Sequence, residues 1–172
     1  MTVEQIPCSV SRVVKSQHIF PNDLNNHHTL FGGKIVADMD VIASLSATKH
    51  SRKSCVTASI DHVDFIEPVT EKDFISYESF VVLTGKSSMI IFVKVIAENL
   101  LTGVKRIAAT SFLTFVALEN GKPAPVPKVV AQSEEEKSLQ KIALERKETK
   151  KTKVEHSKSI ARILSKSLRS SN

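Results

Sequence analysis

The chain of 172 residues has the length of one domain, with room for a hydrophobic core. Apolar residues make up 41% of it and charged residues 24%, a globular composition that excludes an intrinsically disordered chain. It contains no run of 18 apolar residues and its N-terminus lacks a secretory signal pattern, so we expect a cytoplasmic protein with no stable membrane insertion.

The net charge of +6 is concentrated near the end of the chain. Residues 131–172 carry 11 Lys or Arg against 6 Asp or Glu, a net of +5, which leaves 13 against 12, a net of +1, for residues 1–130. We therefore divide the chain into a domain, 1–130, and a basic C-terminal extension, 131–172. The nearly neutral domain lacks the positive surface typical of nucleic-acid-binding proteins, so no nucleic-acid partner is expected.

The N-terminal segment offers little chemistry. Residues 9–20 mix β-branched and polar side chains and predict a half-exposed strand. In the polar loop that follows, His27 and His28 are adjacent but have no third ligand at metal-binding spacing, so we expect them to be solvated, with no metal and no cofactor. Two cysteines, Cys8 and Cys55, are too few for a disulfide scaffold, and we expect both to be reduced and structural.

A pair of glycines, Gly32 and Gly33, opens a helix that is predicted to run to about His50. Without side chains, the glycines let a ligand or another backbone approach the free N–H groups at the helix start, where a partly negative oxygen is stabilised. Apolar residues at three- and four-residue spacing predict that one face of the helix is buried: Ile35, Val36, Met39, Ile42, Ala43 and Leu45.

Two acids lie on this helix, and the period of 3.6 residues places them about 200° apart around its axis, so they cannot share a site. We interpret Asp38 as solvated. For Asp40, which follows Met39 and precedes Val41, two interpretations stay open: a carboxylate at the rim of the buried face, or a catalytic carboxylate.

Four strands are predicted after the helix, over residues 54–66, 73–84, 87–100 and 104–118. Gly85, Gly103 and Gly121 are spaced 18 apart and predict long strands joined by tight turns in an antiparallel meander. One long apolar helix and a meander indicate an α+β fold with the sheet wrapped around the helix. Because the sheet has more apolar face than one helix can cover, we expect at least a homodimer.

The extension has two helical segments. Ser133 and three following glutamates are typical of a helix start. The first segment carries a weak stripe, a candidate face for docking on the domain, formed by Leu139, Ile142, Ala143 and Arg146. The second is amphipathic and basic, with Ile160, Ile163, Leu164 and Leu168 on its apolar face. We interpret it as a solvated helical extension, and a membrane-surface or partner-binding helix is the alternative.

Five blocks of sequence carry a family resemblance: Asn25-x-x-His28-Thr29-Leu30-Phe31-Gly32-Gly33 through Met39-Asp40, then residues 56–61, 65–69, 85–89 and 112–118. In this order and at this spacing, spanning about residues 12–130, the chain resembles the hotdog-fold acyl-CoA thioesterases, in the branch of the bacterial broad-range and brain-type cytosolic acyl-CoA hydrolases. The resemblance implies a hotdog fold, an antiparallel sheet wrapped around one long central helix. It also implies a homo-oligomer, a hexamer built as a trimer of dimers.

The resemblance implies three catalytic residues: Asn25, Asp40 and Thr57. The separation of 15 residues between Asn25 and Asp40 selects Asn25 over the neighbouring Asn26. In the family these groups meet across a dimer interface, with the acid of one subunit facing the amide of the other. Without the resemblance, an ordinary β-branched strand residue is an equally good interpretation of Thr57.

The chemistry of thioester hydrolysis suggests a role for each candidate residue. Attack on the carbonyl places negative charge on its oxygen, which N–H donors at Gly32 and Gly33 would stabilise. Asn25 would orient the attacking water or polarise the same carbonyl, and Thr57 would hold the acid or the water. Asp40 would act as general base on the water or attack directly to form an anhydride, and the sequence leaves both open.

Coenzyme A contacts are also implied. The resemblance places one turn beside the bound CoA, where hydroxyls, N–H groups and a lysine would meet phosphate oxygens, namely Gly85, Lys86, Ser87 and Ser88. Arg52 and Lys53, just beyond the helix, are further candidates. The sequence thus predicts an enzyme that hydrolyses acyl-CoA to a free fatty acid and CoA. The alternatives are a non-catalytic hotdog module that binds acyl-CoA or acyl carrier protein, and an interaction role carried by the extension.

Overall fold

The computed structural model describes residues 4–170, and in the last helix it describes all side chains except those of residues 149–153, 167, 169 and 170. The elements in chain order are β1 (Gln5–Pro7), α1 (Cys8–Ser11), β2 (Val13–His18), η1 (Pro21–Asp23), α2 (Gly32–Ser51), β3 (Ser54–Phe65), β4 (Asp73–Thr84), β5 (Ser88–Asn99), β6 (Lys105–Glu119), β7 (Lys122–Pro123), β8 (Lys128–Val130) and α3 (Glu134–Ser170). No helix in this described part is long and apolar enough to cross a membrane.

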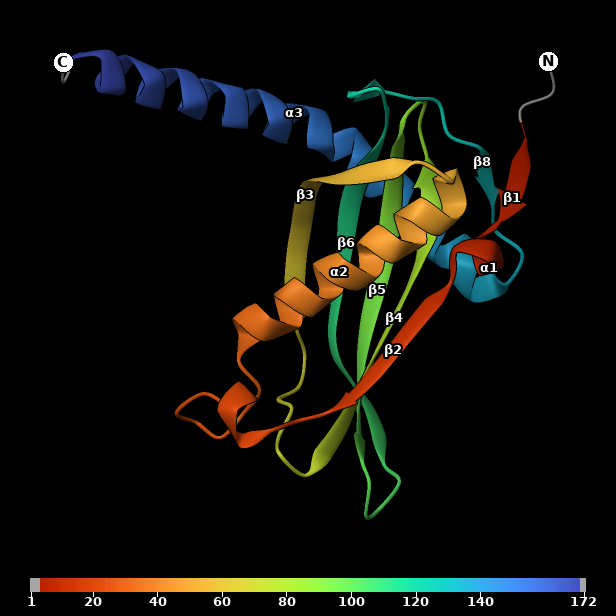
Figure 1. Ribbon diagram of the computed structural model, residues 1–172, viewed down its shortest axis with the longest axis vertical. Helices are drawn as coiled ribbons and strands as arrows, with labels where there is room; N and C mark the ends of the chain where they lie inside the picture. Colours follow the sequence, from red (N-terminus) through yellow and green to blue (C-terminus); the bar gives the residue numbers. More distant parts are fainter. Residues whose placement is uncertain (1–3, 171–172) are drawn as a thin grey trace.

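One antiparallel sheet forms the body of the fold, in the strand order β2-β4-β5-β6-β3, with β7 added to β6 (Figure 1). The predicted meander is confirmed for β4, β5 and β6. It is wrong for β3, which lies at the far edge of the sheet beside β6, with Ser54 opposite Leu118. The connection from β3 to β4, residues 66–72, is too long for a tight hairpin and crosses the end of the sheet instead.

Helix α2 fills the concave face of the curved sheet (Figure 1). Ile35, Met39 and Ile42 are buried as predicted, and the side chains of β5 that point toward the helix form the opposing wall of the core. The helix ends where Arg52 adopts a left-handed conformation with φ of 54°. One residue of the predicted apolar face does not belong to it: Leu45 lies on the outer surface, 51% exposed.

Asp38 is buried, so its interpretation as a solvated acid is wrong. Its carboxylate accepts hydrogen bonds from Lys15 Nζ at 2.6 Å and Gln17 Nε2 at 3.1 Å, both on β2. Lys34 Nζ and the Tyr77 hydroxyl donate at 3.3 Å each. Burial acts to raise the pKa of Asp38, but the hydrogen bond and charge of Lys15 and the charge of Lys34 outweigh it and hold the pKa below its ordinary value. Sequence periodicity missed this site because the cations that bind Asp38 lie partly on another element.

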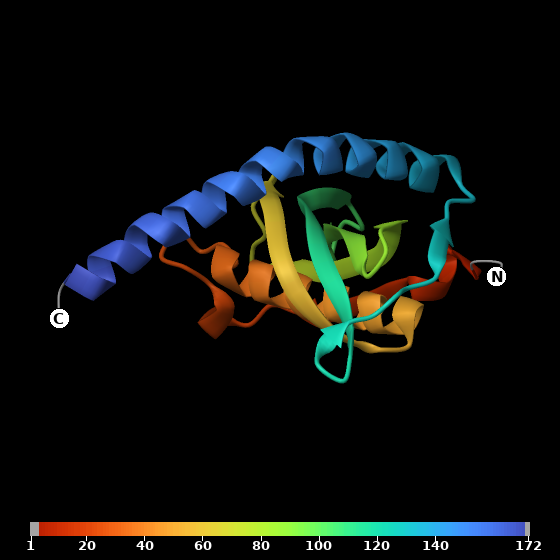
Figure 2. The ribbon, with the colours of Figure 1, turned by 90° about the horizontal axis from the view of Figure 1, so that it is seen from above.

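Helix α3 covers the opposite, convex face of the sheet with its first half and then extends beyond the sheet (Figure 2). Arg12 donates to Glu78 of β4 and, at 3.0 Å, to Glu136 of α3. Ala143 is fully buried, and the Arg146 guanidinium lies 4.8 Å from the centre of the Phe112 ring. In the second half, the described apolar side chains are exposed: Val154, Ile160, Ile163, Leu164 and Leu168.

The N-terminal segment differs from the predicted strand 9–20. A short helix, α1, comes first, and β2 is only six residues long. The Ser11 hydroxyl accepts a hydrogen bond from Val81 N at 2.9 Å, and Gln140 Nε2 donates to Val82 O at 2.9 Å. Side chains thus form hydrogen bonds with the backbone of β4 at Val81 and Val82, beyond the residues of β4 that pair with β2. The two cysteines are free thiols as predicted, and burial raises the pKa of Cys8 to about 11.

An ion pair between β6 and β4 holds the β3–β4 connection. Arg106 donates from Nη1 and Nη2 to the two carboxylate oxygens of Asp73, at 2.9 and 2.7 Å. The hydrogen bonds from Arg106 lower the pKa of Asp73 to about 2, although burial acts in the other direction. Asp73 also accepts hydrogen bonds from the backbone N–H and the hydroxyl of Thr70.

Two truncations test the division of α3. A chain ending at Lys147 should keep the thermal stability and the oligomeric state of the full chain, because the apolar side chains described beyond that point are exposed. A chain ending at Gln132 loses Glu136 and uncovers the Phe112 face, and we expect it to lose more than about 3 kcal/mol of unfolding free energy. Equal stability of the two truncated chains in urea titrations would contradict this division.

The Arg106–Asp73 pair predicts a pH dependence. Because the pKa of Asp73 is lower in the folded chain than in the unfolded chain, its contribution is complete above about pH 4 and is lost as the pH falls toward 2. The Asp73→Asn variant should be less stable than the wild type by roughly 2 kcal/mol at neutral pH. The difference should shrink in acid. Urea titrations at one protomer concentration measure it, and a difference that does not depend on pH would refute the assignment.

Candidate active site

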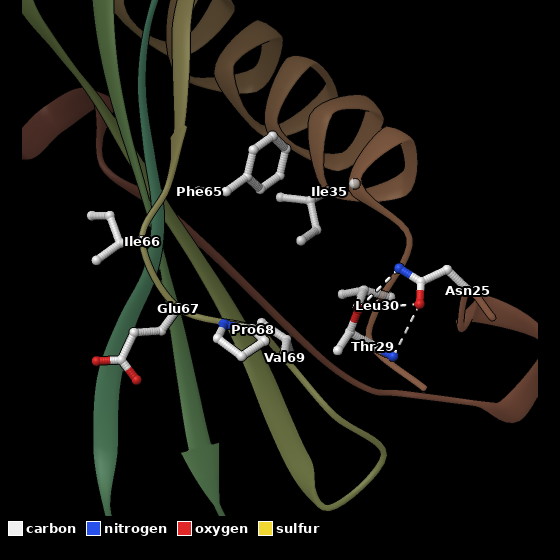
Figure 3. A pocket seen from close by; sticks show the side chains of 10 residues that line it. Asn25, Thr29, Leu30, Ile35, Phe65, Ile66, Glu67, Pro68 and Val69 are labelled. Carbon is white, nitrogen blue, oxygen red and sulfur yellow. Dashed lines mark hydrogen bonds between the residues drawn. The ribbon is translucent and has the colours of Figure 1, made fainter. Parts of the chain in front are cut away.

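Asn25 organises the loop before α2 through its side chain (Figure 3). Its Oδ1 accepts hydrogen bonds from the backbone N–H of His27 at 2.9 Å and of Thr29 at 3.3 Å. Its Nδ2 contacts the Thr29 hydroxyl at 2.9 Å. These contacts fix the amide next to the start of α2. His27 and His28, expected to be solvated, are exposed.

Helix α2 starts at Gly32 as a bare helix terminus. The N-cap residue, Phe31, offers no side-chain hydrogen bond, so the first N–H groups keep their capacity for an acceptor. A side chain at Gly32 would lie 3.3 Å from the Phe65 ring, and one at Gly33 would lie 2.5 Å from the Phe31 ring. The two glycines therefore keep the helix start accessible between two aromatic side chains.

A cavity of about 330 Å³ opens beside Asn25 and Gly32. One side is formed by the Asn25 loop and the first turn of α2, with Leu30 and Ile35, and the other by residues 65–69, which we call the cavity wall (Figure 3). The wall is joined to the loop by a hydrogen bond from Leu30 N to Val69 O at 2.7 Å. The lining combines apolar side chains with the polar side chains of Asn25, Thr29 and Glu67. Such a lining suits an apolar ligand with one polar end.

Asp40 and Thr57 form a second group. The Thr57 hydroxyl donates to Asp40 Oδ1 at 2.8 Å, from β3 to α2. A β-bulge follows Thr57, because the pairing of β3 with β6 shifts register between Thr57 and Ser59. Bulges often re-aim a side chain in this way. Asp40 itself is half-buried on α2.

The two groups do not meet within one chain. Asp40 lies eight residues beyond Gly32, about 12 Å farther along the axis of α2, and it does not line the cavity beside Asn25. The structure therefore joins Asn25 with Gly32 and Gly33, and separately Asp40 with Thr57.

The surface around Asp40 and Thr57 is apolar and uncovered. Val41 and Leu45 on α2 are 52% and 51% exposed, and Ile60, on the same face of β3 as Thr57, is 38% exposed. β3 is also an edge strand: within the described part of the chain, no strand pairs along its outer side. An apolar face beside a free strand edge is typical of a surface that pairs with another chain.

The predicted CoA contacts lie elsewhere. The Gly85 turn is closed by a hydrogen bond from Gly85 N to Ser88 O at 2.7 Å, and Lys86 is exposed on it. Ser88 lies opposite Val116, which in turn lies opposite Val56, so the turn is two strands away from β3, about 10 Å. Arg52 is at the other end of α2 from the cavity, exposed beside Lys49 and Lys53. Within one chain these groups stay apart.

Sequence reasoning missed the cavity wall as part of a site. The residues that hold it, Arg106 and Asp73, are distant in sequence, and neither lies in a recognisable motif. The available signal was Pro68, which stops a strand and lacks an N–H, so that its segment needs support from side chains.

Comparisons with known proteins show the family of the chain. The model of the family described as the thioesterase superfamily matches residues 27–104. The chain is 52% identical to the uncharacterized acyl-CoA thioester hydrolase YkhA of Bacillus subtilis, over 91% of this chain and 92% of the relative. It is 53% identical to an acyl-CoA hydrolase from Bacillus cereus of known crystal structure, with a TM-score of 0.90 over 93% of this chain and 98% of the other.

A third similarity is to an acyl-CoA hydrolase from Staphylococcus aureus, solved in complex with butyryl coenzyme A, coenzyme A and coenzyme A disulfide. It is 38% identical, with a TM-score of 0.90 over 94% of this chain and 99% of that chain. Identity at this level over nearly the whole length of both chains, on a sheet that wraps one central helix, shows that the chain belongs to the hotdog-fold acyl-CoA thioesterases of the thioesterase superfamily.

Proposed function

We propose that the chain, an acyl-CoA thioester hydrolase, performs hydrolysis at a site shared by two protomers. One protomer supplies Asn25 and the helix start at Gly32 and Gly33, and the second supplies Asp40 and Thr57. The observation that carries this proposal is the separation of the two groups on one chain, each beside exposed apolar surface, with Asp40 on the uncovered outer side of α2.

The cavity would hold the thioester and its acyl group. Leu30, Ile35 and Val69 provide an apolar lining for the acyl chain, and Gly32 lies at the polar end of the cavity. There the free N–H groups of the helix start would stabilise the negative charge that develops on the carbonyl oxygen. One such donor typically contributes about 3 kcal/mol to the transition state. Asn25, already fixed by its loop, would orient the attacking water or polarise the same carbonyl.

Asp40 supplies the carboxylate for the chemical step. The Thr57 hydroxyl occupies Oδ1 and fixes the plane of the carboxylate, so that Oδ2 is left for a water molecule or for the thioester carbon. Asp40 acts either as general base on the water, or as nucleophile to form an anhydride that water then cleaves. Thr57 is a positioning residue in both routes.

The spacing of the three residues supports this assignment. Variants of the Staphylococcus aureus hydrolase have been solved with an asparagine, an aspartate or a threonine replaced by alanine, at positions separated by 15 and 17 residues. Asn25, Asp40 and Thr57 have the same separations, 15 and 17. We therefore assign the three residues of this chain to one shared site.

The assembly is proposed to be a homohexamer, a trimer of dimers. An acyl-CoA thioesterase that is 44% identical, with a TM-score of 0.86 over 88% of this chain, was solved as a hexamer. The outer edge of β3 and the exposed apolar residues Val41, Leu45 and Ile60 form the surface proposed for the dimer. CoA would run from the cavity toward the basic and hydroxyl groups of residues 85–88 and Arg52 of neighbouring protomers. Cytosolic acyl-CoA hydrolases of rat and mouse, 33% identical, support a cytoplasmic location.

Replacing Asp40 by asparagine should abolish hydrolysis while leaving the oligomer intact, because the change keeps the shape but removes the base or nucleophile. Free thiol released from a panel of acyl-CoAs, together with the native mass, measures both effects, and we expect a fall in kcat of at least about a hundredfold. Turnover equal to the wild type would remove Asp40 from the mechanism. A wild type that binds acyl-CoA but hydrolyses no member of the panel would favour a non-catalytic binding module.

Mixed oligomers test the shared site. Asn25→Ala and Asp40→Asn protomers are each inactive alone, but a dimer of one of each contains one site with both groups intact. Co-expressed variants with different affinity tags should therefore recover up to about half of the wild-type activity per dimer, since one site in two is complete. Verified mixed dimers without any recovery would place Asn25 and Asp40 of one chain in the same site.

A further inference from the structure

We propose that Arg106 and Asp73 position the cavity wall and thereby set which acyl chains the enzyme accepts. This inference rests on the proposed function, because it takes the cavity beside Asn25 as the acyl site. Neither residue lines the cavity, so both would act through residues 65–69. We call Arg106 and Asp73 the clamp.

The cavity wall has weak support from its own backbone. Its first residue, Phe65, is the last residue of β3, and residues 66–69 belong to no strand. At its first end, the N–H groups of Ile66 and Glu67 both donate to Ala108 O, at 2.8 and 3.2 Å. At its other end, Val69 O accepts from Leu30 N. Pro68, between these two points, has no N–H to contribute.

Arg106 supplies the support at that midpoint. Its Nη2 donates to Pro68 O at 2.8 Å while also donating to Asp73, and its Nε lies 3.5 Å from the Glu67 carboxylate. A planar guanidinium makes these contacts at once because its five N–H groups have fixed directions. A lysine ammonium at the same place cannot form the paired hydrogen bonds to Asp73 and reach Pro68 with the same geometry.

Asp73 connects the clamp to the Asn25 loop through Thr70 and Thr29. Its Oδ2 accepts hydrogen bonds from the Thr70 N–H at 2.8 Å and from the Thr70 hydroxyl at 2.9 Å. Thr70 forms an antiparallel bridge with Thr29, the residue whose hydroxyl lies 2.9 Å from Asn25 Nδ2. The clamp is therefore connected to both sides of the cavity, the wall and the Asn25 loop.

Arg106→Lys tests the proposal against a matched control, Arg12→Lys. Arg12 also binds two carboxylates, and its side chain is similarly exposed, 30% against 23% for Arg106, but it lies on the convex face under α3. We would measure kcat/KM for acyl-CoAs from acetyl to palmitoyl. With a loosened wall, the ratio of kcat/KM between the best and the poorest substrate should fall at least about fivefold in Arg106→Lys. In Arg12→Lys this ratio should stay within about twofold of the wild-type value.

The ratio of the kcat/KM values of two substrates distinguishes a change in the position of the wall from a loss of folding stability. The fraction of folded enzyme cancels when two substrates are compared on one variant, so a loss of stability alone cannot change the range. Asp73→Asn should narrow it in the same direction, and the double variant should narrow it little further, because both residues act through one contact. An unchanged range in Arg106→Lys, or an equal change in Arg12→Lys, would overturn the proposal.

Hydrogen exchange gives a readout that does not depend on hydrolysis. Amide exchange in peptides covering residues 24–31 and 65–72 should accelerate at least about tenfold in Arg106→Lys and stay unchanged in Arg12→Lys. If the wild type hydrolyses none of the acyl-CoAs, the proposed function is wrong and this exchange result alone decides whether the clamp fixes the wall. Unchanged exchange would show that the wall does not depend on Arg106.

Discussion

The rotational setting of α2 about its own axis is the constraint on which the site depends. Asp38 is held inside the fold by Lys15 and Gln17 of β2 and Tyr77 of β4, and the buried carboxylate cannot turn outward without losing these partners. Because Asp40 follows two residues later, on the other side of the helix, fixing Asp38 inward fixes Asp40 outward.

The sheet is occupied on both faces, and the two helices have different roles there. Helix α2 lies in the concave face and presents its outer side, with Asp40, to the surface proposed for the dimer. The first half of α3 lies on the convex face and is fastened by Arg12 and Glu136, far from the cavity. The C-terminal extension, which carries most of the net charge, is therefore attached away from the cavity, and the site itself depends on a few polar groups.

The sequence predicted the elements well where a pattern is local. The strand bounds follow from glycines and β-branched residues, and the catalytic candidates follow from a motif in which Asn25, Asp40 and Thr57 keep fixed separations. It failed where a partner is remote. Asp38 looked solvated because Tyr77 lies 39 residues away, and the Arg106–Asp73 pair spans 33 residues without a motif. The position of β3 in the sheet could not be predicted from the sequence either, because strand order depends on the course of a loop and not on a periodicity within the strand.

The edges of the sheet show how the chain limits its own association. On one side, β2 is short and turns Lys15 and Gln17 inward, and the rest of β4 is satisfied by Ser11 and Gln140. An inward-facing charge on a short edge strand discourages the addition of a foreign strand. On the other side, β3 offers twelve residues of open edge. If β3 pairs with its copy about a two-fold axis, as proposed for the dimer, that edge is covered in both chains, and strand addition along it would stop at two chains.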